Sequence, residues 1–172
     1  GSGDDLFSWR DGDATLSGGE GDDRFILDNQ FDAGPGDGQI DGGPGLDTLV
    51  MVSSWHETEV AMGDDGTGTI LHPDGNIAFT GIDRLELGLG VQRFDGSASD
   101  QGMTVIAQGE SDAYGATTLI GGGGDDHLVD GRDMVGGAGD DILERTDGGG
   151  LLTGGIGADS FVVTHNVGYD PY

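Results

Sequence analysis

The chain has 172 residues, of which 33 are acidic and six are basic, so its formal net charge is −27. Nucleic acids and anionic membranes bind proteins through a positive surface, so we expect neither as a partner. No apolar run approaches the roughly 20 residues of a membrane span, which argues against membrane insertion; the longest is 49–52. Cations are the partners that this charge favours.

The same charge opposes folding. Two carboxylates ~5 Å apart repel by roughly 3 kcal/mol at an effective dielectric constant near 20. The chain has 38 glycines and no cysteine, so it combines many tight turns with no disulfide to hold them. Metal binding is the other common way to stabilise such a chain. We therefore expect a monomer that folds around metal ions.

A nine-residue pattern, G-G-x-G-x-D-x-U-x with U a large apolar residue, recurs through the first fifty residues. Residues 1–8 match its second to ninth positions, which indicates a repeat cut at its first residue and a chain that is part of a longer protein. Two complete copies follow at 18–26 and 42–50. Position six of these three copies is an aspartate: Asp5, Asp23 and Asp47. The copies between them have Ala14 or Gly38 at that position, so we expect them to shape the structure without binding a ligand.

From residue 51 to residue 118 the nonapeptide is lost. Short runs rich in β-branched and apolar residues remain, separated by Gly, Asp and Pro turn signals, and they predict strands. These runs are 68–71, 77–79, 82–87, 103–106 and 117–120. Because no strong helical period is evident, we interpret this segment as β structure. It either continues the neighbouring architecture without the repeat or forms a small inserted cap.

The pattern returns in the last third of the chain with three complete copies, at 121–129, 136–144 and 154–162. Their position-six aspartates are Asp126, Asp141 and Asp159. A further copy between the last two keeps the frame but has Gly150 at position six, and we expect it to bind nothing. The residues after 163 carry no clear motif.

This nonapeptide is the calcium-binding repeat of RTX (repeats-in-toxin) proteins, and the chain resembles that family over about residues 1–50 and 119–163. The resemblance implies an all-β fold, a parallel β-roll or β-solenoid in which two RTX blocks flank a non-canonical β segment. The blocks would be 1–50 and 119–172, with 51–118 between them, and together they would form one continuous domain. Residues 79–85 also resemble the G-I-E/D-x-L segments found between RTX blocks.

In a β-roll each repeat supplies a six-residue turn and a three-residue strand, and successive turns fall on opposite edges. Residues eighteen apart therefore stack on one edge, about 4.8 Å apart, which is a distance that one cation bridges. Asp5 and Asp23 have this spacing. Three aspartates separated by fifteen and eighteen residues are predicted to form a column on one edge of the C-terminal block: Asp126, Asp141 and Asp159. The same-edge neighbour of Asp47 is expected in the irregular segment 27–32.

The donor atoms indicate calcium as the metal, with several ions bound. Only oxygen ligands are on offer, and calcium takes six to eight of them from carboxylates and backbone carbonyls, whereas zinc favours His and Cys. The resemblance implies that turn glycines contribute carbonyls beside the aspartates. The implied ligand residues are Gly3, Asp5, Gly19, Gly21, Asp23, Asp47, Gly122, Gly124, Asp126, Gly137, Gly139, Asp141, Gly155, Gly157 and Asp159.

The apolar position of the repeat is expected to fill a narrow core between two sheets, through Phe7, Leu16, Phe25, Leu128, Leu143, Leu152 and Phe161. For Trp9 and Trp55, packing in the core or at an edge is favoured over a sugar-stacking platform. The chain has no nucleophile elbow, P-loop or catalytic cysteine, and His56 lacks the second histidine of a zinc-protease motif. We therefore expect no enzymatic activity.

Family membership would imply a secreted bacterial protein, exported unfolded by a type I secretion system and folded outside the cell by calcium. The first hypothesis is thus a calcium-responsive structural module of a larger extracellular protein. A second is an accessory module of an extracellular protease, lipase or alginate epimerase that contacts polysaccharide. A third is a spacer or adhesin segment whose middle part binds a partner, such as the rest of the parent protein.

Overall fold

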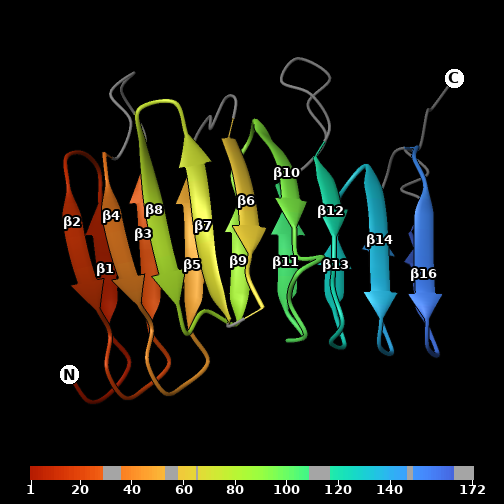
Figure 1. Ribbon diagram of the computed structural model, residues 1–172, viewed down its shortest axis with the longest axis horizontal. Helices are drawn as coiled ribbons and strands as arrows, with labels where there is room; N and C mark the ends of the chain where they lie inside the picture. The colour runs from red at the N-terminus through yellow and green to blue at the C-terminus, as the bar shows by residue number, and fades with distance from the viewer. Residues whose placement is uncertain (29–35, 53–57, 65, 109–116, 147–148, 165–172) are drawn as a thin grey trace, which may run out of the picture.

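The computed structural model describes residues 1–28, 36–52, 58–64, 66–108, 117–146 and 149–164. These residues form seventeen β-strands and no helix (Figure 1), so the predicted all-β class is confirmed. Every strand belongs to one of two open sheets, in which almost all neighbours run parallel. The described part of the chain accordingly contains no helix that is long and apolar enough to cross a membrane.

The first sheet has eight strands, all paired in parallel. In spatial order they are β1 (Leu6–Trp9), β3 (Arg24–Asp28), β5 (Thr48–Val52), β9 (Arg84–Leu87), β11 (Thr104–Ala107), β13 (His127–Val129), β15 (Ile142–Arg145) and β17 (Ser160–Val163).

The second sheet has nine strands, and only β7 runs antiparallel to its neighbours. In spatial order they are β2 (Ala14–Ser17), β4 (Gly38–Asp41), β8 (Gly75–Thr80), β7 (Thr67–His72), β6 (Thr58–Met62), β10 (Val91–Asp95), β12 (Thr118–Ile120), β14 (Asp133–Ala138) and β16 (Leu152–Ile156). The chain alternates between the sheets except at β6–β8, where three strands in succession occupy the second sheet.

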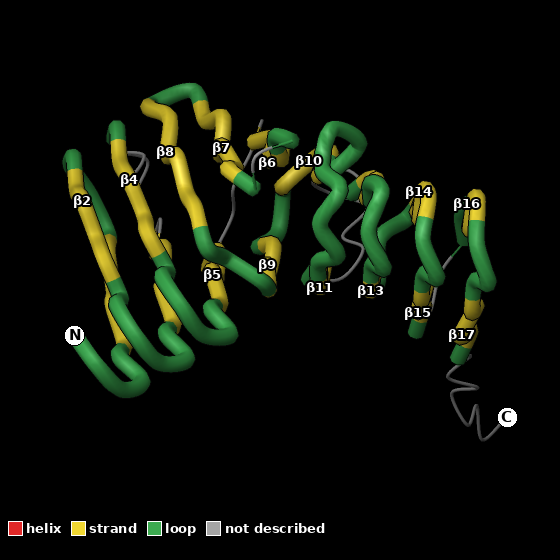
Figure 2. Tube along the Cα trace, turned by 60° about the horizontal axis from the view of Figure 1, so that its bottom comes forward, coloured by secondary structure: helices red, strands yellow, loops and turns green. Residues whose placement is uncertain are grey.

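The two sheets form two layers, and the first and last strands of the chain, β1 and β17, lie at opposite ends of the first sheet (Figure 2). Turns that lead from the second sheet to the first lie along one edge, at the bottom of Figure 1. We call this the glycine edge, and its turns are 18–23, 42–47, 81–83, 96–103, 121–126, 139–141 and 157–159. Turns that lead back to the second sheet lie along the opposite edge.

The strands form where apolar and polar side chains alternate, because successive side chains of a strand point to opposite faces. In β3, Phe25 and Leu27 point between the sheets and are fully buried, while Arg24 faces outward. Burying such an apolar side chain contributes about 1.5–3 kcal/mol. The core is therefore one continuous apolar layer between the sheets.

The apolar repeat positions occupy this core, with one exception. Phe25, Leu128 and Leu143 are fully buried, as expected. Phe7, Leu16 and Leu152 are partly buried and pack against the core. Phe161 is 51% exposed, because it lies on β17, the last strand of its sheet.

Five strands of the middle segment coincide with the predicted runs: β7, β8, β9, β11 and β12. Two others, β6 and β10, were not predicted. β10 has the sequence VQRFD, whose two apolar residues are buried but do not alternate regularly. Its pairing with β6 shifts register between Val91 and Arg93, so an irregularity in the backbone brings both apolar residues inward.

Candidate metal-binding edge

Aspartates stack along the glycine edge in what we call the aspartate ladder. The backbone N–H of Asp5 donates to Oδ1 of Asp23 at 2.7 Å. In the same way the Asp126 N–H donates to Oδ1 of Asp141 at 2.9 Å, and the Asp141 N–H donates to Oδ1 of Asp159 at 3.2 Å. Each carboxylate thus reaches back to the preceding turn. The spacings of eighteen and fifteen residues stack these aspartates as the sequence predicts.

Asp47 corrects one expectation. Its same-edge neighbours are not in segment 27–32 but are Asp23, 24 residues before it, and Asp83, 36 residues after it. The Asp23 N–H donates to Asp47 Oδ1 at 2.8 Å, and the Asp47 N–H donates to Asp83 Oδ2 at 2.9 Å. The first block of the ladder therefore has four members, and the last of them, Asp83, was not predicted from the sequence.

The ladder is interrupted once, at Met103. Its N–H donates to Asp126 Oδ1 at 2.9 Å, so it occupies a ladder position without a carboxylate. Strand pairing places it beside Asp83 on its other side, because Arg84 pairs with Thr104. Met103 therefore divides the ladder into an N-terminal block that ends at Asp83 and a C-terminal block that begins at Asp126.

The first glycine of a repeat lies where two oxygens from consecutive turns converge. A Cβ on Gly136 would overlap Oδ2 of Asp141, in the same turn, and lie 2.7 Å from the carbonyl oxygen of Gly154, in the next. The same pairing of a ladder carboxylate and a carbonyl surrounds three other glycines: Gly18, Gly42 and Gly121. A side chain is excluded from these positions. Two oxygens this close together repel unless donors or a cation lie beside them, and backbone N–H groups reach only some of them: the Gly19 N–H donates to the Gly42 carbonyl at 3.1 Å, and the Gly122 N–H to Asp126 Oδ2 at 2.8 Å.

Several of these carboxylate oxygens have no donor. The Oδ2 atoms of Asp23, Asp47 and Asp141 are buried and accept no hydrogen bond from any described residue. The three side chains are at most 1% exposed. Asp126 is 3% exposed, but its Oδ2 accepts the Gly122 N–H at 2.8 Å. A buried polar atom without a partner costs about 1–3 kcal/mol, and more when it is charged, so these three carboxylates are costly to keep charged without a positive partner.

Burial raises the pKa of the Asp47, Asp126 and Asp141 carboxyls above the ordinary aspartate value. Hydrogen bonds from backbone N–H groups partly offset this rise in pKa, and neighbouring ladder carboxylates increase it. Removal from water and mutual repulsion both disfavour the charged form. These three carboxylates thus need either a proton or a cation close by.

The second and fourth repeat glycines form two further columns on the same edge. Most have positive φ, which side chains rarely adopt: Gly3, Gly19, Gly21, Gly43, Gly45, Gly137, Gly139, Gly155 and Gly157. A Cβ on Gly137, Gly155 or Gly157 would overlap the carbonyl oxygen of the glycine before it in the column. Gly122 and Gly124 belong to the columns without positive φ. The columns therefore direct backbone carbonyls from one turn toward the next.

The described residues contain no group of three or more His, Cys, Asp or Glu side chains that could hold a metal ion. Side chains alone therefore do not make a site on this edge. Each pair of consecutive turns on the glycine edge, which we call a step, offers one or two carboxylates together with glycine carbonyls. This is an all-oxygen donor set. Such a set suits calcium, whose ligands include backbone carbonyls and water. The residues present fit that ion.

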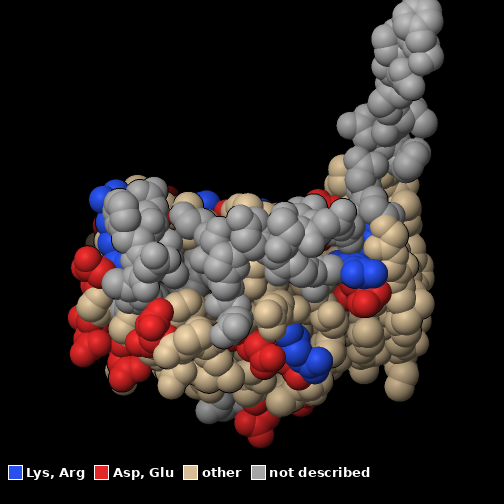
Figure 3. All heavy atoms as spheres, turned by 90° about the horizontal axis from the view of Figure 1, so that it is seen from above, with Lys and Arg blue, Asp and Glu red and all other residues tan. Residues whose placement is uncertain are grey.

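Basic side chains do not compete for these carboxylates. Glu86, on the outer face of the first sheet, pairs with Arg24 at 2.9 Å and with Arg84 at 3.2 Å. On the second sheet Arg93 pairs with Asp95. In Figure 3 the basic patches nearest the viewer likewise lie against acidic side chains. These arginines are thus neutralised on the sheet faces. The one cation given on the glycine edge by the described residues is the N-terminal ammonium of Gly1, which donates to the Gly18 carbonyl at 2.5 Å.

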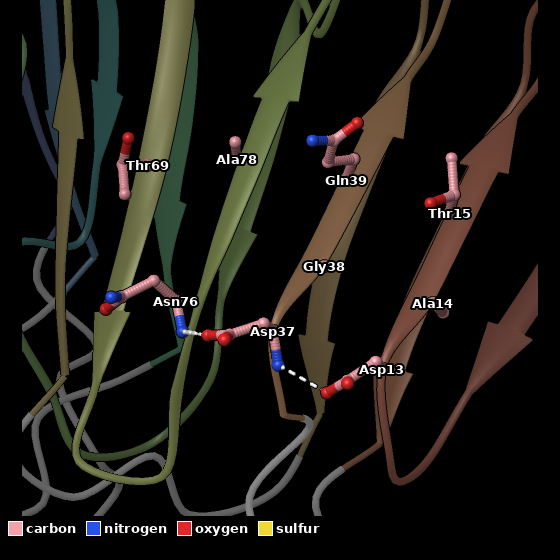
Figure 4. A pocket seen from close by; sticks show the side chains of 9 residues that line it. All are labelled: Asp13, Ala14, Thr15, Asp37, Gly38, Gln39, Thr69, Asn76 and Ala78. Carbon is pink, nitrogen blue, oxygen red and sulfur yellow. Dashed lines mark hydrogen bonds between the residues drawn. The ribbon is translucent and has the colours of Figure 1, made fainter.

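The opposite edge has a simpler ladder. The Asp37 N–H donates to Asp13 Oδ1 at 3.0 Å, and the Asn76 N–H donates to Asp37 Oδ1 at 2.9 Å (Figure 4). Here each carboxylate reaches forward to the following turn. Asp13 and Asp37 are exposed, so their second oxygens face water and need no metal.

The opposite edge also has side-chain donors for its turns. Trp9 is 6% exposed, and its indole N–H donates to the carbonyls of Asp11 and Gly12 at 3.1 and 3.0 Å. The 4% exposed Arg145 donates to the carbonyl of Gly131 at 2.7 Å and to that of Arg132. The preferred core or edge packing of Trp9 is confirmed, whereas Trp55 lies outside the described residues.

On this edge lie the three residues that stand at position six of a repeat in place of aspartate, namely Ala14, Gly38 and Gly150. Gly38 faces the Trp9 ring, where a Cβ would overlap the indole. Gly150 has φ +144°, and a Cβ there would overlap the Arg132 carbonyl. Ala14 begins β2 and packs partly buried against the core. The two glycines have no side chain because neighbouring groups fill the space.

A shallow polar hollow of about 540 Å³ lies on the outer face of the second sheet, over β2, β4, β8 and β7 (Figure 4). Its exposed lining consists of carboxylate, hydroxyl and amide groups around the small side chain of Ala78. The polar residues are Asp13, Thr15, Asp37, Gln39, Thr69 and Asn76. It is separate from the aspartate ladder.

Comparison of the chain with protein-family models, with curated proteins and with solved structures gives no match. The chemistry of the glycine edge therefore carries the functional argument.

Proposed function

We propose that this protein is a calcium-binding β-roll module that folds when its glycine edge takes up calcium. The observation that carries the proposal is the set of three buried carboxylate oxygens without a donor, on Asp23, Asp47 and Asp141. Each lies, together with a carbonyl oxygen of the next turn, within 2.7 Å of the point where a Cβ on the first glycine would stand. A cation at this point satisfies both oxygens at once.

The β-roll architecture is part of the same proposal. Its support is the alternation of the chain between two parallel sheets, together with the stacking of repeat positions across most of the molecule. The β6–β8 hairpin then replaces a single strand of one turn of the roll. Under this proposal the two repeat-bearing blocks and the segment between them form one continuous stack.

Calcium binding of this kind is coupled to folding. The carbonyls and carboxylates of neighbouring turns come from residues 15 to 36 apart in the sequence, so the unfolded chain holds no preformed site. A ligand that binds only the folded state at 100 times its Kd stabilises it by about 2.7 kcal/mol per site. Three such sites give ~8 kcal/mol, which is comparable to the whole stability of a small domain.

The proposed setting is outside a bacterial cell, in a larger protein exported by a type I secretion system. The support for this is the resemblance of the repeats to those of RTX proteins and the net charge of −27. A chain held unfolded by its own charge at low calcium, and folded at high calcium, suits export followed by folding. We propose a structural role without enzymatic activity.

The test compares far-UV circular dichroism in EDTA with that in millimolar calcium. The expected result is a disordered spectrum in EDTA and a β-sheet spectrum in calcium, with little recovery in magnesium. Magnesium demands octahedral geometry and loses its water reluctantly. Equal β content in EDTA and in calcium would refute the proposal.

The second candidate is an accessory module that contacts polysaccharide. The observation that favours it is the hollow on the second sheet, whose hydroxyl, amide and carboxylate groups could bind sugar hydroxyls. Calorimetric titration with neutral and uronic-acid oligosaccharides tests it, with Gln39→Ala and Thr15→Ala as variants of the lining. Heat that disappears in both variants supports this candidate, whereas no heat with any oligosaccharide excludes it.

A further inference from the structure

The outer face of the second sheet has a second hollow beside the one already described. It has a volume of about 360 Å³ and lies over the same four strands, closer to the glycine edge. Thr15, Gln39 and Ala78 line both hollows. The two therefore form one open depression, which we call the sheet hollow.

Strand pairing arranges the side chains of the sheet hollow in rows across the four strands. One row consists of Thr15, Gln39, Ala78 and Thr69 (Figure 4), and the next of Ser17, Asp41, Thr80 and Thr67. Neighbouring strands lie about 4.8 Å apart, so each row presents groups at this interval over roughly 14 Å. Ala78 is the smallest side chain of its row, and the longer Gln39 and Thr69 stand on either side of it.

The β6–β8 hairpin builds half of the sheet hollow. β7 and β8 contribute Thr69, Asn76 and Ala78, whereas β2 and β4 belong to the repeat-bearing N-terminal block. A regular alternation between the sheets would place one strand between β4 and β10, and the second sheet has three there. The hairpin therefore widens the outer face at the point where the hollow lies.

The groups of the sheet hollow suit a ligand that is rich in hydroxyls and carries positive charge. Its described lining contains hydroxyl, amide and carboxylate side chains but no Lys, Arg or His. Asp13 and Asp37 are exposed, and each uses one oxygen to accept a backbone N–H, which leaves the other oxygen open to a ligand. Asp41 adds a third carboxylate nearer the glycine edge. An anionic sugar would meet these carboxylates with no basic side chain of the lining beside them.

We propose that the sheet hollow binds a glycan whose sugar units carry free amino groups, such as an oligomer of glucosamine. This inference rests on the second candidate function and names the class of sugar that the site takes. The chain of sugars lies across the strands, with successive units over neighbouring strands. Hydroxyl and amide side chains bind the sugar hydroxyls, and the carboxylates bind the protonated amines. Uronic-acid chains are repelled by the same carboxylates.

The first test compares ligands by calorimetric titration of the whole chain in saturating calcium. At about pH 6 amines are protonated and exposed aspartates are ionised. A glucosamine tetramer should bind at least about threefold more tightly than its N-acetylated form, because exposed ion pairs contribute modestly, and also more tightly than a uronic-acid tetramer. It should exceed tetralysine too, which has the same net charge but no sugar hydroxyls.

These titrations separate this inference from the function on which it rests. Equal or tighter binding of the N-acetylated or the uronic-acid tetramer would overturn the choice of sugar and leave the second candidate function intact. Equal binding of tetralysine would show attraction by charge alone and would overturn the inference as well. No heat with any of the sugars would overturn both.

The second test locates the site. Asp13→Asn combined with Asp37→Asn keeps the oxygens that accept backbone N–H groups and removes two charges, so the glucosamine tetramer should bind at least about threefold more weakly. Binding of the N-acetylated form should be unchanged. Ala78→Arg places a large cation in the middle of the hollow and should abolish binding of the glucosamine tetramer. Full affinity in either variant would place the ligand elsewhere and overturn the inference.

A matched control is available on the same edge of the molecule. Asp130 and Asp133 also accept backbone N–H groups of a following turn, and β14, which begins at Asp133, is separated from β7 by β6, β10 and β12. Asp130→Asn combined with Asp133→Asn removes the same charge and should leave the affinity for the glucosamine tetramer unchanged. A loss equal to that of the Asp13 and Asp37 variant would show that net charge, not the sheet hollow, attracts the ligand.

Discussion

The turns on both edges of the sheets have carbonyl oxygens that need a positive partner, but the two edges place different groups beside them. On both, turns expose carbonyls that need a positive partner, and on both, aspartate carboxylates accept backbone N–H groups of a neighbouring turn. On the opposite edge Trp9 and Arg145 donate directly to turn carbonyls. On the glycine edge no such side chain is present in the described residues, and buried carboxylates face the carbonyls instead.

This difference shows that a ladder of aspartates is not in itself a metal site. The exposed carboxylates of Asp13 and Asp37 make the same bond to the neighbouring backbone as the buried ones. What distinguishes the glycine edge is the burial of the second carboxylate oxygen and the absence of a side chain at each first glycine. The opposite edge should therefore be insensitive to calcium.

The largest effect is expected at the centre of the C-terminal column. Asp141 belongs to the steps above and below it, so Asp141→Ala should disturb two sites of about 2.7 kcal/mol each at 100 times Kd, or ~5 kcal/mol together. Asp126→Ala and Asp159→Ala, at the ends, should cost about half as much. Urea unfolding in calcium measures the loss of unfolding free energy in each of the three variants. Equal losses would mean that Asp141 does not take part in two calcium sites.

An effect of about 3 kcal/mol is expected at the opposite edge. Arg145→Met removes the donor for two carbonyls, each worth about 1–3 kcal/mol when left unsatisfied. The loss in unfolding free energy should appear in saturating calcium with no change in the number of ions bound. Arg132→Met, at an exposed position, is the matched control and should change neither quantity. A lower number of bound calcium ions in Arg145→Met would contradict the claim that only the glycine edge binds calcium.

A smaller effect is expected from pH in the absence of calcium. The raised pKa of Asp47, Asp126 and Asp141 means that the folded state holds protons the unfolded state has lost. Between the ordinary aspartate pKa of about 3.9 and the raised values, stability thus increases as pH falls and is lost as pH rises. In EDTA, β content should grow on acidification from neutral pH toward about pH 4.

Circular dichroism across this pH range measures the effect. The triple variant Asp47→Asn, Asp126→Asn, Asp141→Asn is the control, because it removes the raised groups and should flatten the profile. In saturating calcium the trend should reverse, since protons compete with the ion. A wild-type profile in EDTA that matches the triple variant would contradict the assignment of the proton-linked groups.

The smallest effect is expected from the exposed ladder of the opposite edge. Asp37→Asn keeps an oxygen for the Asn76 N–H and removes a charge that faces water. Exposed substitutions of this kind change stability by less than about 0.5 kcal/mol. Thermal unfolding in calcium should give a melting temperature close to that of wild type. A shift as large as that of Asp47→Asn would place a cation on this edge too.

Much of the glycine edge could be predicted because the repeat has a fixed length. Spacings of eighteen residues place Asp5 beside Asp23 and Asp141 beside Asp159, and the structure keeps both pairs. The neighbours of Asp47 could not be found this way. Six extra residues before it and the β6–β8 hairpin after it lengthen the spacing to 24 and 36 residues.

Other features left weaker signals. Asp83 precedes Leu85 by two residues, as Asp23 precedes Phe25, and this D-x-U spacing is a sign that it joins the ladder. The donors on the opposite edge could not have been found from sequence. Trp9 reaches the carbonyl of a residue two positions away, but Arg145 reaches Gly131, fourteen positions away, only because parallel pairing brings β13 and β15 together.

Anomalous diffraction from a crystal grown in calcium would test the central claim most directly. The proposal predicts calcium peaks along the glycine edge only, beside the first glycine of the turns whose carboxylate oxygen lacks a donor, at Gly18, Gly42 and Gly136. The turns held by Trp9 and Arg145 should show none. Peaks at those turns, or a glycine edge without peaks in a folded protein, would contradict it.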